Sequence, residues 1–148
     1  MDDIDRRILE LLVEDGRASV TDIADAVHLS LSAASQRLRR LKQSGAIDRF
    51  TIRVGAAAVG RPVESLVELQ LAPGSSWDGI DDALRDNPSI VDAIHLTGGF
   101  DYQLRIRATS IEELDALLRW LKESLGVRET STRIVLHTVE GFPREPAV

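Results

Sequence analysis

A very short connection, His28-Leu29-Ser30, separates two segments with helical periodicity, and it constrains the front half of the chain more than any other feature. The first segment, residues 20–27, has an apolar face and follows an S-x-x-D capping box made by Ser19 and Asp22. The second segment, residues 30–46, opens on a capping serine and ends near a glycine. Two helices joined by so tight a turn predict a helix-turn-helix.

A further helix is predicted ahead of these two, over residues 2–15. Asp2 can cap its N-terminus, and the acidic residues that follow suit the positive end of the helix dipole. Apolar residues recur at i, i+4, i+7 and i+8 from Ile4, which gives the helix one face to bury. The three helices together predict a complete helix-turn-helix domain.

His28 occupies the turn before the last of these helices, where the backbone often needs a positive φ. Histidine adopts that conformation more readily than most residues. No second polar residue that could share a ligand or a proton lies near it in the sequence. We therefore interpret His28 as a turn residue rather than a metal ligand or a catalyst.

The last helix of this domain has an apolar side and a polar side. At 100° per residue, its apolar residues form one face that is expected to pack inside the domain: Leu31, Ala34, Leu38 and Leu41. The other side starts with small polar residues and continues with arginines. This distribution suits the major groove of DNA, because the first part can read base edges while the rest meets phosphates. The predicted DNA-binding residues are Ser30, Ser32, Ala33, Ser35, Gln36, Arg37, Arg39 and Arg40.

The net charge of −6 argues against non-specific nucleic-acid binding by the chain as a whole. The charge is unevenly distributed, however. Between Ser35 and Arg53 arginines and a lysine recur, and Asp48 is the single acidic residue. The predicted DNA-binding helix and the segment after it are therefore basic on an otherwise acidic protein.

The segment AIDRFTIRV, residues 46–54, alternates apolar and polar residues and predicts a strand that serves as a wing beside DNA or as a connector. The next segment, GAAAVGRP at residues 55–62, contains two glycines and a proline and is typical of a hinge. We expect a winged-type helix-turn-helix domain over residues 1–50, a strand and hinge linker over 51–62, and a second domain over 63–148.

The second domain alternates strand and helix patterns in the order β-α-β-β-α-β. Strands are predicted over residues 63–71, 90–97, 101–108 and 127–140, and helices over residues 75–86 and 110–125. In the first helix Trp77 is expected to point inward, and Ser110 with Glu113 is expected to form a capping box for the second. The order predicts the ferredoxin-like plan, with two helices on one face of an antiparallel sheet, and an α+β protein overall.

The ferredoxin-like plan leaves the other face of the sheet bare. That face is expected to carry apolar and long amphipathic side chains, and such a face commonly pairs with a second copy of the chain. A homodimer would place two predicted DNA-binding helices on one side of the molecule. Its target would then be two half-sites about one helical turn apart, or a multiple of that.

The composition favours a binding protein over an enzyme. Cysteine is absent, which removes disulfides, thiolate zinc sites and thiol nucleophiles and fits a cytoplasmic protein. The three histidines are widely spread without a metal-ligand spacing, and no nucleophile–base pair or phosphate loop stands out. We predict no catalytic residue, no metal and no cofactor. No apolar run approaches the ~20 residues of a membrane span, so no membrane partner is expected.

The run Gly98-Gly99-Phe100-Asp101-Tyr102 joins the two middle strands and has two interpretations. It can be a hairpin turn in which the glycines supply a positive φ. It can also be a binding site, with unblocked backbone N–H groups for a carboxylate and Asp101 for an ammonium group. Chemistry alone favours the turn.

The chain resembles the leucine-responsive and asparagine regulator family of prokaryotes, the Lrp/AsnC or feast/famine regulators. The resemblance covers nearly the whole chain and is carried by co-linear segments. They read DDIDRRILELLVEDGRASVTDIADAVHLSLSAASQRLRRLKQSGAI, HLTGGFDYQLRIRA and VRETSTRIVLHTV.

The resemblance implies a DNA-binding N-terminal domain and a C-terminal domain that binds an effector and oligomerises. Family members form dimers that often assemble into octamers, and many bind an amino acid at the interface between dimers. The implied effector-binding residues are Gly98, Gly99, Phe100, Asp101 and Tyr102, with Ser131 and Thr132 on the last strand. Gly99 stands where the family commonly has an acidic residue, so a side-chain contact is lost there while backbone contacts remain.

The sequence therefore predicts a sequence-specific transcriptional regulator that binds double-stranded DNA and is modulated by an amino acid or a related small molecule. The alternative is a small-molecule-binding assembly protein whose N-terminal domain contacts protein rather than DNA. The arginines of residues 37–40 and the outward Ser32 and Gln36 favour DNA.

Overall fold

The computed structural model describes residues 1–75 and 77–139 of the chain. It divides between Arg53 and Val54 into two compact units, whose main bodies are Met1–Arg53 and Val54–Thr138 and which are described separately. None of the helices in the described residues has the length and apolar content needed to cross a membrane.

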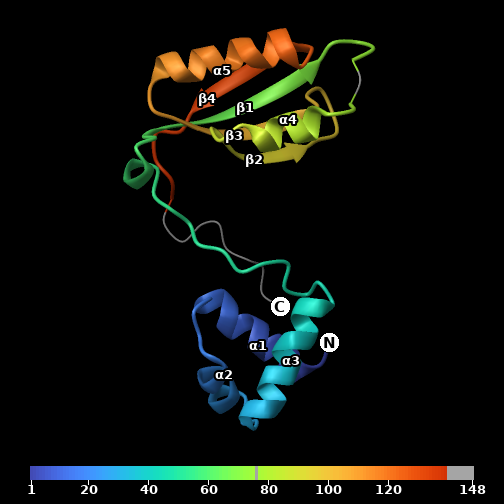
Figure 1. Cartoon of the computed structure of the whole chain (residues 1–148), viewed down its shortest axis with the longest axis vertical. Coiled ribbons are helices and arrows are strands. Elements are labelled where there is room, and N and C mark those ends of the chain that lie inside the picture. The colour runs from blue at the N-terminus through green and yellow to red at the C-terminus, as the bar shows by residue number, and fades with distance from the viewer. Residues whose placement is uncertain (76, 140–148) are drawn as a thin grey trace. The chain divides into compact units, whose positions relative to one another are not determined.

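Three helices form the first unit (Figure 1). They are α1, Asp3–Glu14; α2, Val20–Ala26; and α3, Leu31–Gln43. Each helix begins after a side chain that accepts a hydrogen bond from the backbone N–H three residues further on. These capping residues are Asp2, Ser19 and Ser30, as predicted. At α1 and α2 the reciprocal bond of the capping box is also present.

The tight turn between α2 and α3 has the predicted backbone. His28 adopts a φ of 54°, and it is the only residue other than glycine with a positive φ in the described part of the chain. The interpretation of His28 as a turn residue is confirmed. Gly45, with a φ of 77°, ends α3 in the same conformation.

One face of α3 packs into the core of the first unit. Ala34 and Leu41 are buried there against apolar residues of α1 and α2, and Leu38 is partly buried beside them. Leu31 was expected on this face but is 56% exposed. That expectation is wrong because the first position of α3 extends past the core cluster, which takes its first α3 residue at Ala34.

Residues 46–54 do not form the predicted strand. The segment has no strand assignment, and the first unit contains no sheet among the described residues, so the predicted wing is absent there. Alternation alone cannot make a strand, because backbone N–H and C=O groups need a neighbouring strand to pair with. Ile47 still packs against the core of the first unit, but residues 48–54 are exposed, with Ile52 at 80%.

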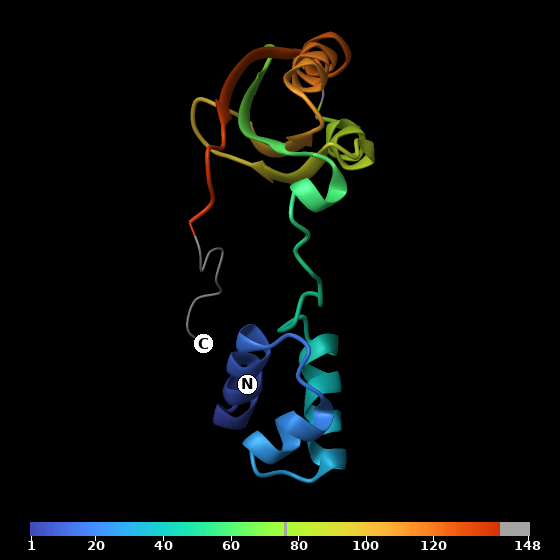
Figure 2. The same ribbon diagram turned by 90° about the vertical axis from the view of Figure 1, so that its left-hand side faces the viewer.

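The second unit is a four-stranded antiparallel sheet with two helices. Its elements are β1, Val63–Leu71; α4, Ile80–Asp86; β2, Ile90–His95; β3, Tyr102–Ala108; α5, Ile111–Ser124; and β4, Val127–Ile134. The strand order is β2-β3-β1-β4. Figure 2 shows both helices on one face of the sheet, with the other face bare. The predicted ferredoxin-like arrangement is confirmed.

The core of the second unit lies between the sheet and its helices. Residues buried on β1 and β3 alternate along each strand, and the pairs Val67–Leu104 and Leu69–Tyr102 stand side by side across the ladder. From α5, Leu114, Leu117 and Leu121 complete this core. The apolar side chains that recur every two residues in the strands therefore pack against those that recur every 3.6 residues in α5.

Helix α4 begins at Ile80, five residues later than predicted. Gly79 precedes it with a φ of 80°, a left-handed conformation that an α-helix cannot contain. Trp77 consequently lies before the helix and is 48% exposed, so its predicted inward position is wrong. Strand β2 ends at His95 and β4 at Ile134, short of the predicted 97 and 140; Glu140 itself lies outside the described residues.

The predicted capping box at α5 is half present. The Ser110 side chain accepts from the N–H of Glu113 as expected. The carboxylate of Glu113, however, accepts from the N–H of Thr109 at 2.8 Å and from the hydroxyl of Ser89 at 2.9 Å. It also pairs with Arg61 at 2.8 Å, so it joins α5 to the segment that enters β1.

The predicted hinge, residues 55–62, is partly ordered against the second unit. It contains the short 3-10 helix η1, Ala57–Val59. Arg61 donates to Glu113, to Ser89 and to the carbonyl of Arg107, while Nη1 of Arg107 donates to the carbonyl of Val54 at 2.8 Å. The chain is therefore attached to the second unit as far back as Val54.

The bare face of the sheet is more charged than expected. Glu64 of β1 pairs with Arg105 and Arg107 of β3, and Glu68 pairs with Arg133 of β4. Leu66, between the two glutamates, is the apolar side chain that β1 contributes to this face. If two copies of the chain pair through this face, charged side chains as well as apolar ones therefore take part in the contact.

Candidate DNA-binding and effector sites

The outer face of α3 carries most of the predicted DNA-binding residues. One hollow on the surface of the first unit is lined by five of them: Ala33, Gln36, Arg37, Arg39 and Arg40. Ser32 is exposed near the start of the helix, and its hydroxyl lies 3.1 Å from that of Ser30. Small residues at the start of a helix allow close approach to a partner surface, and exposed arginines beyond them can bind phosphates. Ser35 is half-buried and lies outside this hollow.

Arg37 is directed toward α1. Its Nη1 donates to both carboxylate oxygens of Asp2, at 2.9 and 2.6 Å, and to Oδ1 of Asp5 at 2.8 Å. The Arg37 side chain is only 24% exposed. The hydrogen bonds that Arg37 donates to these two carboxylates raise its pKa. Its cationic group is thus engaged within the first unit.

Arg40 shares the same buried carboxylate. Its Nη2 donates to both oxygens of Asp5, at 3.0 and 2.7 Å, but the side chain stays 59% exposed. Arg39, also exposed, forms no ion pair with any residue in the described ranges. The three arginines of α3 therefore have three different environments.

Asp5 holds this cluster together. Its side chain is 2% exposed, and burial raises the pKa of the carboxyl group. Hydrogen bonds from Arg37 and from the N–H of Asp2, together with the charge of Arg40, outweigh that effect and leave the pKa below its usual value. The carboxylate is therefore ionised at neutral pH, and it connects the start of α1 with the middle of α3.

The sequence interpretation treated Asp2 as the helix cap and Asp5 as a charge suited to the positive end of the helix dipole, and it missed this connection. A signal was present: Asp2 and Asp5 are three residues apart at the start of one helix, and Arg37 and Arg40 are three apart on another. Residues at that spacing share a helix face, so two facing helices can match the pairs.

The loop at residues 98–102 is built as a turn with a structural carboxylate. Gly98 has a φ of 115°, whereas Gly99 has no positive φ. Asp101 donates its N–H to the carbonyl of Leu69 at 2.7 Å, and its Oδ2 accepts from the N–H of Leu71 at 2.7 Å. The Asp101 carboxylate was predicted to bind an ammonium group, but one of its two oxygens is already hydrogen-bonded to β1.

Tyr102 points away from this loop, into the helix side of the sheet. Its ring is 4% exposed, and its hydroxyl donates to Asp81 of α4 at 2.8 Å. The ring stacks on His95 at 4.8 Å between centroids, and the Trp77 ring lies 4.7 Å from His95 and 6.0 Å from Tyr102, so the three rings form one cluster. Burial and the neighbouring Asp81 raise the pKa of Tyr102 to about 12, so the hydroxyl keeps its proton.

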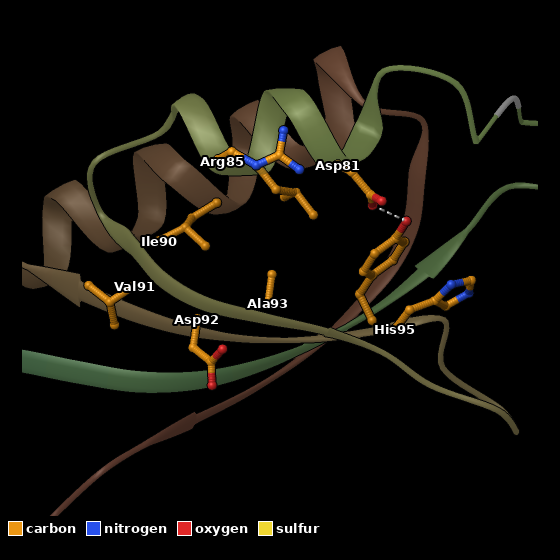
Figure 3. Close-up of a pocket in the computed structure, with 9 residues that line it drawn as sticks. Asp81, Arg85, Ile90, Val91, Asp92, Ala93 and His95 are labelled. Carbon is orange, nitrogen blue, oxygen red and sulfur yellow. Dashed lines mark hydrogen bonds between the residues drawn. The ribbon is translucent and has the colours of Figure 1, made fainter. Parts of the chain in front are cut away.

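Tyr102 also borders a cleft between α4 and the edge strand β2, with a volume of about 340 Å³. Figure 3 shows Asp81 and Arg85 of α4 on one side of the cleft and Ala93 of β2 on the other. The small side chain of Ala93 leaves space that a larger residue would fill.

Ser131 and Thr132 lie on β4, across β1 from the loop. Ser131 pairs with Glu68 on the bare face, and Thr132 pairs with Val67 on the helix face. The seven predicted effector-binding residues thus divide between a loop, a buried ring and two faces of an edge strand. One chain does not bring them together into a single cavity.

Comparison with known proteins agrees with both units. Residues 1–42 match the AsnC-type helix-turn-helix domain, and residues 64–143 match the Lrp/AsnC ligand binding domain. The chain belongs to the Lrp/AsnC family. The predicted family resemblance is confirmed.

Lrp/AsnC relatives align over most of the chain. The transcriptional regulatory protein DoeX of Halomonas elongata is 31% identical over 95% of this chain and 90% of its own length. The HTH-type transcriptional regulator LrpA of Mycobacterium tuberculosis is 31% identical over 93% and 91%. The crystal structure of the M. tuberculosis LrpA protein covers 100% of both chains with a TM-score of 0.85 and 28% identity.

The solved relatives include complexes with a ligand. The feast or famine regulatory protein of M. tuberculosis complexed with L-methionine is 29% identical, covers 97% of both chains and has a TM-score of 0.89. The relatives named by function are transcriptional regulators. This chain is accordingly a DNA-binding regulator of the Lrp/AsnC type.

Proposed function

We propose that α3 enters the major groove of a specific DNA sequence, with Ser32, Ala33 and Gln36 facing the bases. The observation that carries this proposal is the division of α3 into a buried face and a hollow lined by Ala33, Gln36, Arg37, Arg39 and Arg40. Gln can form bidentate hydrogen bonds with adenine, and exposed arginines neutralise phosphates. Arg39 and Arg40 are the proposed phosphate contacts, aided by Ser30 and Ser35 near the entry of the helix.

We propose that the regulator acts as a homodimer, which can assemble further into an octamer. The bare sheet face and the exposed apolar segment near Ile52 are surfaces that one chain leaves uncovered. A two-fold assembly would present two copies of α3 to half-sites about 34–36 Å apart or a multiple of that.

We propose an amino acid as effector, bound where two copies meet. The L-methionine complex of the M. tuberculosis relative supports this class of ligand. In this chain Gly98 and Gly99 are exposed and Ser131 is half-buried, while Asp101 and Tyr102 are engaged internally. We expect backbone N–H groups, rather than the Asp101 carboxylate alone, to bind the effector. A second copy is needed to complete the site.

We propose that the chain regulates without catalysing a reaction and needs no cofactor. The titratable groups with shifted pKa values take part in helix caps, ion pairs and the Tyr102–Asp81 bond. Each of these shifts has a structural partner that accounts for it.

DNase I footprinting of the protein on the DNA upstream of its own coding region tests the proposed function, because such regulators often act there. We expect protected segments in phase with the DNA helix at moderate salt, and no protection of a scrambled duplex of equal composition. Gln36→Ala is expected to change which sequence is protected, whereas Arg39→Ala weakens binding to all sequences. Equal protection of native and scrambled DNA would contradict the proposal and favour a protein partner for the first unit.

A further inference from the structure

We propose that Asp5 of α1 is a positioning residue for DNA binding, whose buried carboxylate holds the guanidinium group of Arg40 at the surface of α3. The proposal rests on the proposed function of α3 as the DNA-contacting helix. It also assigns Arg37, which the sequence places among the DNA contacts, to this carboxylate instead of a phosphate.

Arg40 is held on one side and open on the other. Both oxygens of Asp5 accept from a single nitrogen, Nη2, at 3.0 and 2.7 Å. The side chain is nevertheless 59% exposed, and its Nη1 and Nε form no hydrogen bond within the described residues. A guanidinium group that is already fixed in direction loses less side-chain freedom when it binds a phosphate.

Arg37 helps to neutralise the buried carboxylate of Asp5. A carboxylate that is 2% exposed needs a cation nearby, because burial of an unpaired charge is strongly unfavourable. Arg37 supplies one by donating to Asp5 at 2.8 Å and to Asp2 at 2.6 Å. Two arginines then balance two aspartates. The outward donors of Arg40 are not needed for that balance and remain available to DNA.

Arg39 is the matched comparison. It lies next to Arg40 on the same helix, lines the same hollow, has the same charge, and forms no ion pair among the described residues. Loss of Asp5 should therefore affect a phosphate contact of Arg40 and leave one of Arg39 unchanged.

The test is a double-mutant cycle on the full-length protein. The probe is a duplex that the wild-type protein enriches from a randomised library, and its affinity is measured over a salt series. The variants are Asp5→Asn, Arg39→Gln, Arg40→Gln and the combinations of Asp5→Asn with each arginine change. Asp2→Asn is the control, because Asp2 pairs with Arg37 and not with Arg40.

We expect each arginine change to reduce the slope of log K against log salt by about 0.9 for each bound protomer. Asp5→Asn should weaken binding in the wild-type and Arg39→Gln backgrounds by the same factor and have little effect in the Arg40→Gln background. Asp2→Asn should combine additively with Arg40→Gln. A merely structural role of Asp5 would give the same factor in every background, and that result overturns the inference.

Two measurements keep the outcome decisive. Circular dichroism at the assay temperature establishes whether each variant is folded. If Asp5→Asn is unfolded, Asp5→Glu replaces it, because glutamate keeps the charge but displaces the carboxylate. A wild-type protein that enriches no sequence overturns the proposed function and the inference together. Additive losses in a protein that does bind overturn the inference alone.

Discussion

Substitution of Asp101 separates a structural role for the loop at residues 98–102 from a direct role in effector binding. The Asp101 carboxylate accepts the N–H of Leu71 at 2.7 Å, and Leu71 is 8% exposed at the end of β1. Asp101→Ala removes this acceptor and leaves a buried donor without a partner. We therefore expect the second unit to lose stability even when no amino acid is present.

The size of the loss follows from the cost of an unsatisfied buried donor, about 1–3 kcal/mol. We take about 2 kcal/mol for Asp101→Ala, because the backbone bonds of Asp101 to Leu69 and Leu96 remain in the variant. Asp101→Asn is the matched control. Its carbonyl can still accept from Leu71, so it should cost about 1 kcal/mol or less.

Tryptophan fluorescence during urea unfolding is a suitable assay, because both tryptophans of the chain, Trp77 and Trp120, lie in the second unit. The fluorescence transition therefore reports that unit without a contribution from tryptophans in the first. In a domain of this size a loss of 2 kcal/mol lowers the melting temperature by about 8–16 °C.

Two results would refute this reasoning. The first is equal stability of wild type and Asp101→Ala without ligand, which would show that the bond to Leu71 contributes nothing. The second is equal loss in Asp101→Ala and Asp101→Asn. A variant of unchanged stability that no longer shows an amino-acid-induced rise in melting temperature would instead assign the carboxylate to effector binding.

Three further substitutions test individual features of the fold. His28→Gly should stabilise the first unit by about 1 kcal/mol, since glycine adopts a φ of 54° without strain, and thermal melting followed by far-UV circular dichroism measures it. Ser65→Ala should stabilise the second unit by about 1 kcal/mol in urea unfolding, because the Ser65 hydroxyl is buried without a hydrogen-bond partner among the described residues; a loss would reveal a partner. Hydrogen bonds from Thr109 and Ser89 lower the pKa of Glu113 from 4.5 to about 2, so its ionised form stabilises the fold above pH 4.5 and the contribution is lost as pH falls toward 2. The stability difference between wild type and Glu113→Gln should shrink over that interval, and a difference independent of pH would contradict the assignment.

The sequence predicted those features whose cause lies within a few residues. Ser19 and Ser30 cap the helices that follow them because the accepting hydroxyl and the donating N–H are three residues apart. The alternation from Val63 to Leu71 produced a strand with the expected buried face, because side-chain direction in a strand is fixed by its period of two. The positive φ of His28 follows in the same way from the short turn that contains it.

Features that depend on distant residues were not predictable by the same means. Residues 46–54 alternate as a strand does but have no strand to pair with in the described chain. The ion pairs of Arg37 and Arg40 with α1 cannot be read from the sequence, since their partners lie 32–35 residues away. Asp101 likewise reads as a free carboxylate until β1 supplies the N–H of Leu71, 30 residues earlier.

The central claim is that α3 reads a specific DNA sequence. In-vitro selection of bound duplexes from a randomised library, performed in parallel for wild type and Gln36→Ala, tests it most directly. We predict that wild type enriches two related half-sites about one helical turn apart or a multiple of that, and that Gln36→Ala changes the preferred base at one position in each half-site. Identical enriched sequences for both proteins, or no enrichment by wild type, would contradict the account.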